Sequence, residues 1–223
     1  MLFTTQTLSV VIGGHSGIGQ AVAEALALRP GRVITASREN GLDISDTGSI
    51  NAFFGALGTI DNLIITAGSQ APGGALLELD LQAAKQAFDT KFWGTLNSIR
   101  SAAAHLSPQG SITLTSGFLA RKTVPGTLVK TAMNAALESA AKILARELAP
   151  IRVNVVSPGL TDTNAYAGLA PEARQAMLAR AAATLPAGRY GQATDLAAGY
   201  LLAIDNPFMT GATIDIDGGA LIN

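Results

Sequence analysis

The stretch LSVVIGGHSGIGQAVAEALAL, residues 8–28, decides the fold of this chain. Leu8–Ile12 is a short apolar run rich in β-branched residues, which predicts a buried strand. Gln20–Leu28 spaces its apolar residues along one face of an α-helix. Glycines fill the turn between them, so that strand, tight turn and helix follow one another directly. This order predicts the first βα unit of a parallel sheet.

The same alternation continues to the end of the chain. The predicted strands are Leu8–Ile12, Arg32–Ala36, Asn62–Thr66, Ser111–Thr115, Ile151–Val156 and Thr213–Ile216. The predicted helices are Gln20–Leu28, Thr47–Leu57, Asp80–Leu106, Leu128–Leu148, Pro171–Ala183 and Thr194–Ile204. Strands that are apolar throughout are buried on both faces by helices. We therefore expect an α/β fold with a Rossmann-type, doubly wound parallel sheet, in a single domain over residues 1–223 with a small helical lid at roughly 160–192.

Composition excludes several classes of function. The chain has no cysteine and two isolated histidines, so we expect no disulfide, no thiolate chemistry and no metal site. A net charge of −1 without a basic tract predicts no nucleic-acid partner. No apolar run approaches the roughly 18 residues of a membrane span, and the first residues lack the basic start of a signal peptide. We expect a cytoplasmic protein that does not associate with membranes.

Apolar residues make up 48% of the chain and charged residues only 14%. The surplus apolar surface is hidden in the core or between copies of the chain. Two helical ranges, 80–107 and 128–149, carry runs of Ala and Ser, either for packing on the sheet or for contact with another subunit. We favour the second interpretation, which predicts a homodimer or homotetramer formed through these helices.

The glycine turn has the chemistry of a phosphate site. Glycines let the main chain approach a pyrophosphate, and the start of the following helix offers free N–H groups and a positive dipole. The predicted contacts are Gly13, His15, Ser16, Gly17, Ile18 and Gly19. A tight turn without a ligand is the alternative, but the strand–turn–helix context favours a dinucleotide.

Ser37 and Arg38 follow the second predicted strand, where NAD-binding proteins place an acid on the ribose 2′-hydroxyl. A hydroxyl and a guanidinium there suit a 2′-phosphate, which a carboxylate would repel. The cofactor predicted from these residues is NADP(H), with His15 as a possible further donor to the phosphate. A solvated Arg38, or one paired with Glu39, is the alternative.

Over its whole length the chain resembles the short-chain dehydrogenase/reductase family. The resemblance is carried, in order, by the glycine turn, by Asp43–Asp46, Thr66–Gly68, Ile151–Gly159 and Thr161–Thr163, and by Gly188–Gly191 and Thr210–Gly219. It implies cofactor contacts at Asp43, Ile44, Ala67, Gly68, Pro158, Gly159, Leu160, Thr161 and Thr163. One departure is that Asp43 follows Arg38 almost at once, so that a helix common in the family is missing.

By resemblance, the family moves a hydride between a nicotinamide and a carbonyl or alcohol with the help of a tyrosine, a lysine, a serine and an asparagine. Alignment places Lys130 at the tyrosine position, Asn134 at the lysine position, Gly117 at the serine position and Lys91 at the asparagine position. The only tyrosines, Tyr166, Tyr190 and Tyr200, lie beyond the helix in question. All four catalytic positions are therefore expected to differ from the family pattern.

Three interpretations follow. In the first, the protein is a reductase with altered chemistry, in which Lys130 donates the proton and its pKa is lowered by burial and by the second cation Lys91. Lys91 then approaches the ribose or the unknown substrate, Asn134 supplies an amide and Ser116 holds the substrate carbonyl. In the second, the fold binds NADP(H) without redox turnover and serves as a sensor or partner-binding module. In the third, disfavoured by Ser37 and Arg38, it binds another nucleotide-like ligand such as S-adenosylmethionine.

Overall fold

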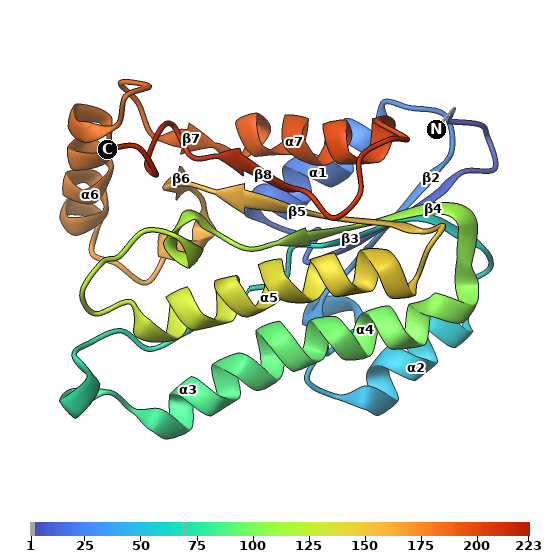
Figure 1. Ribbon diagram of the computed structural model, residues 1–223, viewed down its shortest axis with the longest axis horizontal. Helices are drawn as coiled ribbons and strands as arrows, with labels where there is room; N and C mark the ends of the chain where they lie inside the picture. The colour runs from blue at the N-terminus through green and yellow to red at the C-terminus, as the bar shows by residue number, and fades with distance from the viewer. Residues whose placement is uncertain (1–2, 69) are drawn as a thin grey trace.

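A six-stranded parallel sheet forms the centre of the computed structural model, which describes residues 3–68 and 70–223 (Figure 1). Its strands are β1 (Leu8–Ile12), β2 (Arg32–Ala36), β3 (Ile60–Ile65), β4 (Leu106–Thr115), β5 (Arg152–Pro158) and β8 (Thr213–Ile216). They lie in the order β2-β1-β3-β4-β5-β8, which reverses direction between β1 and β3. Reversal at this point defines a doubly wound sheet, and the predicted Rossmann-type fold is confirmed.

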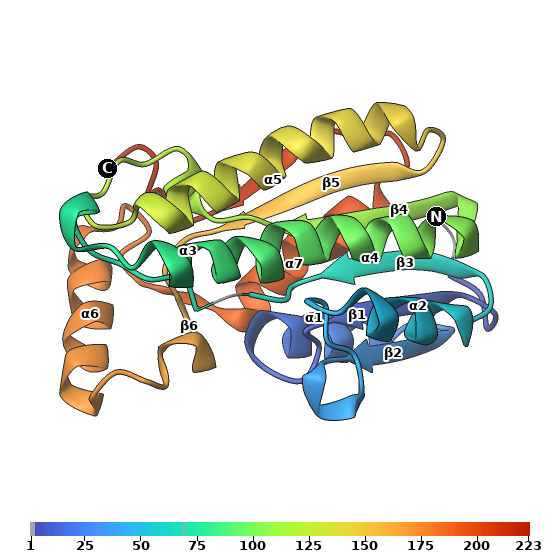
Figure 2. The ribbon, with the colours of Figure 1, turned by 90° about the horizontal axis from the view of Figure 1, so that it is seen from below.

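Helices cover both faces of the sheet. On one face lie α1 (Gly17–Ala27) and α7 (Ala193–Asp205), and on the other α2 (Thr47–Gly55), α4 (Gly94–Ala102) and α5 (Leu128–Glu147). The second face is seen from the front in Figure 2, where α3 (Leu81–Phe88) continues the line of α4. The sheet therefore has the three-layer arrangement that its doubly apolar strands require.

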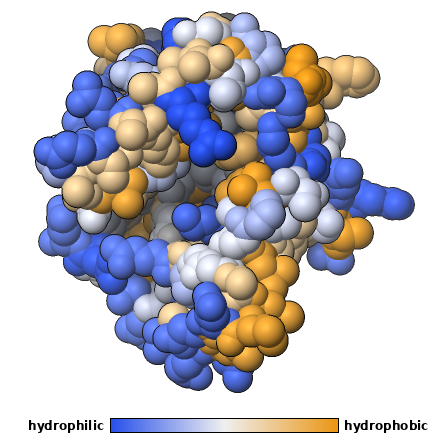
Figure 3. Space-filling model, turned by 90° about the vertical axis from the view of Figure 1, so that its left-hand side faces the viewer, coloured by the Kyte–Doolittle hydropathy of each residue, from blue (hydrophilic) through white to orange (hydrophobic). Residues whose placement is uncertain are grey.

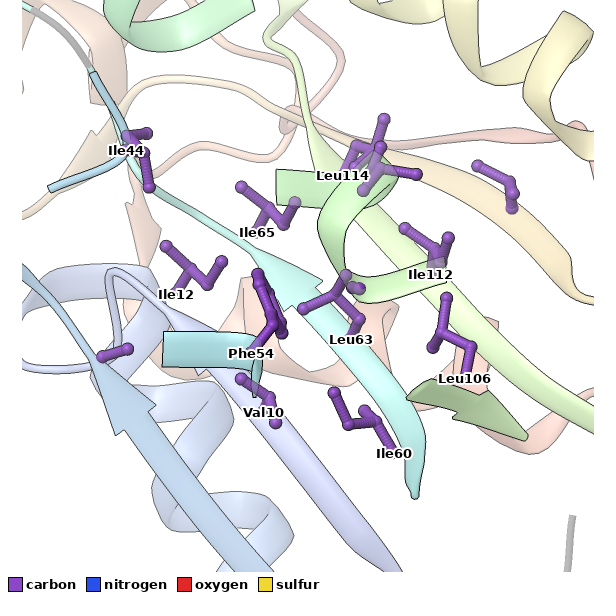
Figure 4. Packing of buried hydrophobic residues seen from close by; sticks show 14 of the residues in the cluster. Val10, Ile12, Ile44, Phe54, Ile60, Leu63, Ile65, Leu106, Ile112 and Leu114 are labelled. Atoms are coloured by element: carbon purple, nitrogen blue, oxygen red, sulfur yellow. The ribbon is translucent and has the colours of Figure 1, made fainter. Parts of the chain in front are cut away.

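Strand periodicity sorts the core into two clusters. Val10 and Ile12 of β1 point into the larger cluster, against Phe54 of α2 (Figure 4). Val11, between them, points the opposite way into the cluster that contains α1 and Tyr200 of α7. Successive strand side chains alternate between faces, so each β-branched run serves both layers at once.

The sheet ends at β2. The turn that follows, Arg38–Asn40, is a single 3₁₀ turn, and the next helix begins only at Thr47. In the common order 3-2-1-4-5-6, a further strand lies outside this edge. Here the short connection supplies no outer strand, so the turn after β2 lies at the open edge of the sheet.

The prediction of one continuous helix over Asp80–Leu106 is wrong in two respects. A π-helical turn, Asp89–Trp93, joins α3 to α4, and Leu106 and Ser107 already belong to β4. The predicted range 80–107 therefore extends into the sheet. Apolar spacing detects a helical face but not an inserted residue, because a π turn widens the helix without ending it.

Arg152 ties the end of α7 to the sheet. Its guanidinium donates to the carbonyl oxygens of Ala203 at 2.6 Å and Ile204 at 2.8 Å. Asn154, two residues on, donates through Nδ2 to the carbonyl of Met209 at 2.8 Å. A basic side chain is well suited to the free carbonyls at a helix end. Arg152 and Asn154 therefore hold the end of α7 and the segment before β8 against β5.

The two ends of the predicted lid lie side by side. Its first strand, β6 (Thr161–Asp162), pairs with its last, β7 (Gly191–Gln192), and α6 (Pro171–Thr184) lies between them. Arg174 of α6 donates to Asp162 Oδ1 through Nε at 3.1 Å. This ion pair holds the helix against the strand at which the lid begins.

Within residues 3–68 and 70–223 there is no helix long and apolar enough to cross a membrane. The same part of the chain contains no group of three or more His, Cys, Asp or Glu side chains placed to hold a metal ion.

Tyr200 offers a test of the core. Its buried hydroxyl lies 2.6 Å from Thr115 Oγ1, which itself donates to the carbonyl of Ile65. Tyr200→Phe removes one hydrogen bond and should lower the free energy of unfolding by about 1 kcal/mol. Thr115→Val leaves both the tyrosine hydroxyl and the carbonyl with one partner fewer and should cost about 2–3 kcal/mol in urea unfolding. Equal costs, or the reverse order, would contradict this account.

Candidate functional site

The glycine turn, the turn after β2 and the ends of β4 and β5 all lie at the carboxyl edge of the sheet, on the left in Figure 1. Figure 3 looks at this edge and shows a hollow near its centre. In open α/β sheets, ligands bind outside the carboxyl ends of the strands where the strand order reverses. The hollow therefore lies where a ligand is expected.

The glycine turn brings α1 unusually close to β1. A Cβ on Gly19 would lie 2.2 Å from the carbonyl oxygen of Gly13, and Gly13 and Gly17 have φ of 85° and 53°. Ile18 packs inward against the cluster beneath α1. The Ser16 side chain makes no capping hydrogen bond to the residues that the structure describes. The first N–H groups of α1 are therefore open to a ligand.

The turn after β2 is organised by Asn40. Its Oδ1 accepts from the Ser37 amide at 2.6 Å, and its Nδ2 donates to the carbonyl of Thr35 at 2.8 Å. His15 reaches across from the glycine turn, with Nε2 at 3.1 Å from Thr35 Oγ1 and 3.5 Å from Asn40 Nδ2. Arg38 is exposed at the start of the turn. The structure thus brings His15 of the glycine turn into contact with the turn that contains Ser37 and Arg38.

Asp43 and Ile44 follow this turn. Asp43 Oδ1 accepts from the Ser45 hydroxyl at 2.6 Å and from its amide at 2.9 Å; these bonds, with a smaller contribution from Arg38, lower the pKa of Asp43. The side chain of Ile44 is buried in the core, and its carbonyl oxygen would lie 2.5 Å from a Cβ on Gly94. The start of α4 therefore packs closely against the main chain of this segment.

Ala67 and Gly68 lie directly across the glycine turn. The amide nitrogen of Ala67 would be 2.9 Å from a Cβ on Gly13, and Thr66 Oγ1 donates to the carbonyl of Ile12 at 3.0 Å. Gly68 is exposed beside them. The segment that follows β3 therefore packs directly against the glycine turn.

The segment after β5 closes the other side. Pro158 pairs with Ile216 of β8, and a Cβ on Gly159 would lie 2.5 Å from Asp217 Cα. Leu160 lines a small hollow between the lid and β8. The main chain at this point therefore packs too closely for any residue but glycine.

Thr161 and Thr163 carry the lid toward the glycine turn. Thr161 is buried and donates through Oγ1 to the carbonyl of Gly159 at 3.1 Å. A Cβ on Gly17 would lie 3.2 Å from Thr163 Cβ, so that lid and turn are in contact. The predicted pyrophosphate and nicotinamide segments, 146 residues apart in sequence (163 − 17), thus meet in space.

A second group of polar side chains lies between the π turn, the end of β4 and the start of α5. Lys91 Nζ donates to Asn134 Oδ1 at 2.7 Å, and a Cβ on Gly117 would lie 2.9 Å from Asn134 Nδ2. Loss of solvent around the ammonium, and then the nearby positive charge of Lys130, lower the pKa of Lys91 to about 8. A lysine that titrates so close to neutral pH can exchange protons with a ligand.

The other two predicted catalytic residues have different surroundings. Ser116 Oγ donates to Glu138 Oε1 at 2.8 Å, and Glu138 Oε2 lies 3.1 Å from Arg121 Nε. Lys130 is exposed near the start of α5. The structure therefore brings Lys91 and Asn134 into direct contact, places Lys130 nearby and ties Ser116 to a separate charged network.

Sequence reasoning missed Asn40 and Glu138. Asn40 could have been found from the Ser-x-x-Asn spacing of Ser37 and Asn40, because this spacing is close to that of a capping box. Glu138 lies one helical turn beyond Asn134, on the same face of α5, but nothing in its own spacing indicates that Ser116 would reach it.

Comparisons with known proteins agree with this architecture. A family model described as "Enoyl-(Acyl carrier protein) reductase" matches residues 40–220. The chain is 32% identical to "Carbonyl reductase family member 4" of Danio rerio, over 95% of this chain and 97% of that protein. It is 31% identical to "Short-chain dehydrogenase/reductase ucsE" of Acremonium sp, over 96% and 95% of the two chains.

Among solved structures, the chain resembles one described as "Crystal structure of a small-chain dehydrogenase in complex with NADPH". The two share 51% sequence identity and a TM-score of 0.96, over 98% of this chain and 100% of the other. The motifs, the sheet order and these likenesses lead to one assignment. The chain belongs to the short-chain dehydrogenase/reductase family of oxidoreductases.

Proposed function

We propose that this protein is an NADP(H)-dependent oxidoreductase that transfers a hydride between the nicotinamide and a carbonyl or alcohol substrate. The observation that carries the proposal is the turn formed by Ser37, Arg38 and Asn40, which lies beside His15 and the glycine turn. The NADPH complex of the protein that is 51% identical supports the same cofactor.

The residues present fit this cofactor. The open N–H groups of α1 suit a pyrophosphate, and the close approach at Gly19 leaves no room for a side chain there. Arg38 offers a planar set of donors to a 2′-phosphate, and the Ser37 hydroxyl offers one more. Thr161 and Thr163 would face the nicotinamide, because they belong to the segment of the lid that meets the glycine turn.

The bound cofactor supplies or accepts the hydride, and the chain must manage the proton. Hydride transfer to a carbonyl leaves an alkoxide, which needs an acid and hydrogen-bond donors in fixed positions. In this chain the positions of the family's serine, tyrosine and lysine hold Gly117, Lys130 and Asn134. We propose that the proton-transfer chemistry is therefore atypical and uses the side chains of Lys91, Asn134, Lys130 and Ser116.

A second candidate is an NADP(H)-binding sensor or partner-binding module without turnover. The observation that favours it is the engagement of Ser116 by Glu138, together with the exposure of Lys130. A serine held by a carboxylate is less free to bind a carbonyl oxygen.

We also propose that the chain assembles as a homodimer or homotetramer through α3, α4 and α5. Trp93, at the junction of α3 and α4, is 54% exposed, and Leu81, Leu128 and Ile143 are exposed on the same helices. Large exposed apolar side chains on adjoining helices are typical of a surface that another subunit covers.

The cofactor proposal predicts a charge-specific loss. Arg38→Asp should weaken NADPH binding about tenfold or more, because a charge-assisted bond to phosphate is worth roughly 1.5–3 kcal/mol. NADH, which has no 2′-phosphate, should lose no affinity. Calorimetry with both nucleotides measures this, and Arg146→Ala on the far end of α5 is the control. A variant that binds both nucleotides as the wild type does would refute the assignment of Arg38.

Turnover separates the two candidates. The wild-type protein should oxidise NADPH in the presence of an activated dicarbonyl such as 2,3-butanedione or 9,10-phenanthrenequinone, followed by absorbance at 340 nm. NADPH binding without oxidation by either carbonyl would favour the non-catalytic module and reject the reductase.

The assembly proposal predicts a mass change. Trp93→Lys should shift the protein toward the monomer in light scattering, because a charge would have to be buried at the interface. Leu28→Lys, at the exposed end of α1, is the matched control and should leave the mass unaltered. A wild-type monomer, or an unchanged mass for Trp93→Lys, would contradict the proposal.

A further inference from the structure

Lys91 is held by a local distortion of its helix. It lies in the π-helical turn Asp89–Trp93, and its carbonyl oxygen accepts from Thr95 Oγ1 at 2.6 Å. Directly after this turn, Gly94 backs onto the carbonyl of Ile44 so closely that a Cβ would lie 2.5 Å away. The helix therefore cannot shift or rotate here without a clash. Such turns are rare, and many occur at functional sites.

The Asn134 amide is oriented by its two neighbours. Its Oδ1 faces the Lys91 ammonium, which has only donors to offer, and its Nδ2 faces Gly117. Any side chain at position 117 would begin 2.9 Å from that nitrogen. Gly117, Asn134 and Lys91 thus form a fitted set, in which the glycine makes room for the amide and the amide holds the lysine.

Lys91 is also open to a ligand. The residue is partly exposed although its ammonium is desolvated, and within residues 3–68 and 70–223 that ammonium has one hydrogen-bond partner, Asn134 Oδ1, which leaves its other N–H groups for a substrate. Lys130, in contrast, is exposed at the start of α5. Geometry therefore favours Lys91 over Lys130 as the group that meets the substrate.

We propose that Lys91 is the catalytic acid of this protein, the group that donates the proton to the carbonyl oxygen during reduction, and that Asn134 is its positioning residue. This inference rests on the proposed reductase function. It differs from the assignment made from sequence, in which Lys130 is the donor and Lys91 is a second cation that approaches the ribose or the substrate.

The hydride supplied by NADPH forms the new C–H bond and leaves NADP⁺, while the π electrons of the carbonyl move to its oxygen. That oxygen takes a proton from Lys91 Nζ, so an N–H bond breaks and an O–H bond forms. The neutral amine of Lys91 then recovers a proton from water. In the oxidation direction, the neutral amine accepts the alcohol proton.

The charges around Lys91 set the pH at which it works. Burial and Lys130 lower its pKa to about 8. Glu138, on the same face of α5, is paired with Arg121, and Asp43, on the segment beneath Gly94, is bound by Ser45. Donation requires the ammonium form, so reduction should be full well below pH 8, fall to about half near pH 8 and decline further as the pH rises.

The experiment compares Lys91→Met and Lys91→Arg with the wild type in NADPH-driven reduction of 2,3-butanedione. Both variants should lose about 10²–10⁴-fold in kcat, because methionine has no proton to give and arginine does not release its own. NADPH affinity should be unchanged in both. Lys142→Met, on the exposed part of α5, is the matched control and should retain wild-type kcat.

A second readout does not depend on activity. The Nζ resonance of Lys91, identified by its absence in Lys91→Met, should titrate near pH 8 by NMR in the protein without cofactor. Lys130→Met removes the neighbouring positive charge and should move this titration, and the alkaline limb of kcat, toward higher pH. If Lys91 were merely structural, Lys130→Met would not move the Lys91 titration and the alkaline limb of kcat together.

The outcomes separate the two proposals. Reduction that persists in Lys91→Met, or a Lys91 titration at the ordinary lysine value, overturns the assignment of Lys91 while leaving the reductase intact. A wild-type protein that binds NADPH but reduces no carbonyl probe overturns both. Loss of kcat in both Lys91 variants with unchanged NADPH affinity and a titration near pH 8 supports the proposal.

Discussion

Gly19 lies so close to Gly13 that a single added carbon would come within 2.2 Å of the Gly13 carbonyl oxygen and 2.4 Å of Thr66 Oγ1. This contact joins the start of α1 to the ends of β1 and β3, the two strands between which the sheet changes direction. The open amides of α1 therefore point into the space beyond the sheet. The turn after β2 and the lid then close around the same space.

Much of this arrangement follows from the sequence because it depends on local chemistry. Strand and helix periods, and the glycines between Leu8–Ile12 and Gln20–Leu28, are properties of neighbouring residues. The position of Ser37 and Arg38 near the glycine turn could be predicted because the end of β2 lies beside the first turn of such a sheet. The resemblance to the family supplied the remaining segments that are predicted to contact the cofactor, and the structure brings them to one edge of the sheet.

The residues that escaped prediction depend on contacts distant in sequence. The π turn exists where Gly94 is pressed against Ile44, 50 positions earlier (94 − 44), and no helical pattern records that contact. His15 meets Asn40 only because the turn after β2 folds back on the glycine turn. Ser116 was expected near a substrate, but its partner Glu138 lies on a helix whose packing fixes the direction of both side chains.

Arg121 and Lys91 both lie near the end of β4, but their positive charges have different partners. Arg121 is paired with both Glu138 and Asp215, so it links the segment after β4 to β8 at little electrostatic cost. Within residues 3–68 and 70–223, Lys91 has no carboxylate in an ion pair and lies near a second lysine, with the neutral Asn134 amide as its hydrogen-bond acceptor. A structural lysine gains nothing from this arrangement, since a carboxylate would stabilise its charge better. The arrangement lowers the cost of losing a proton, which is what an acid in a catalytic cycle requires.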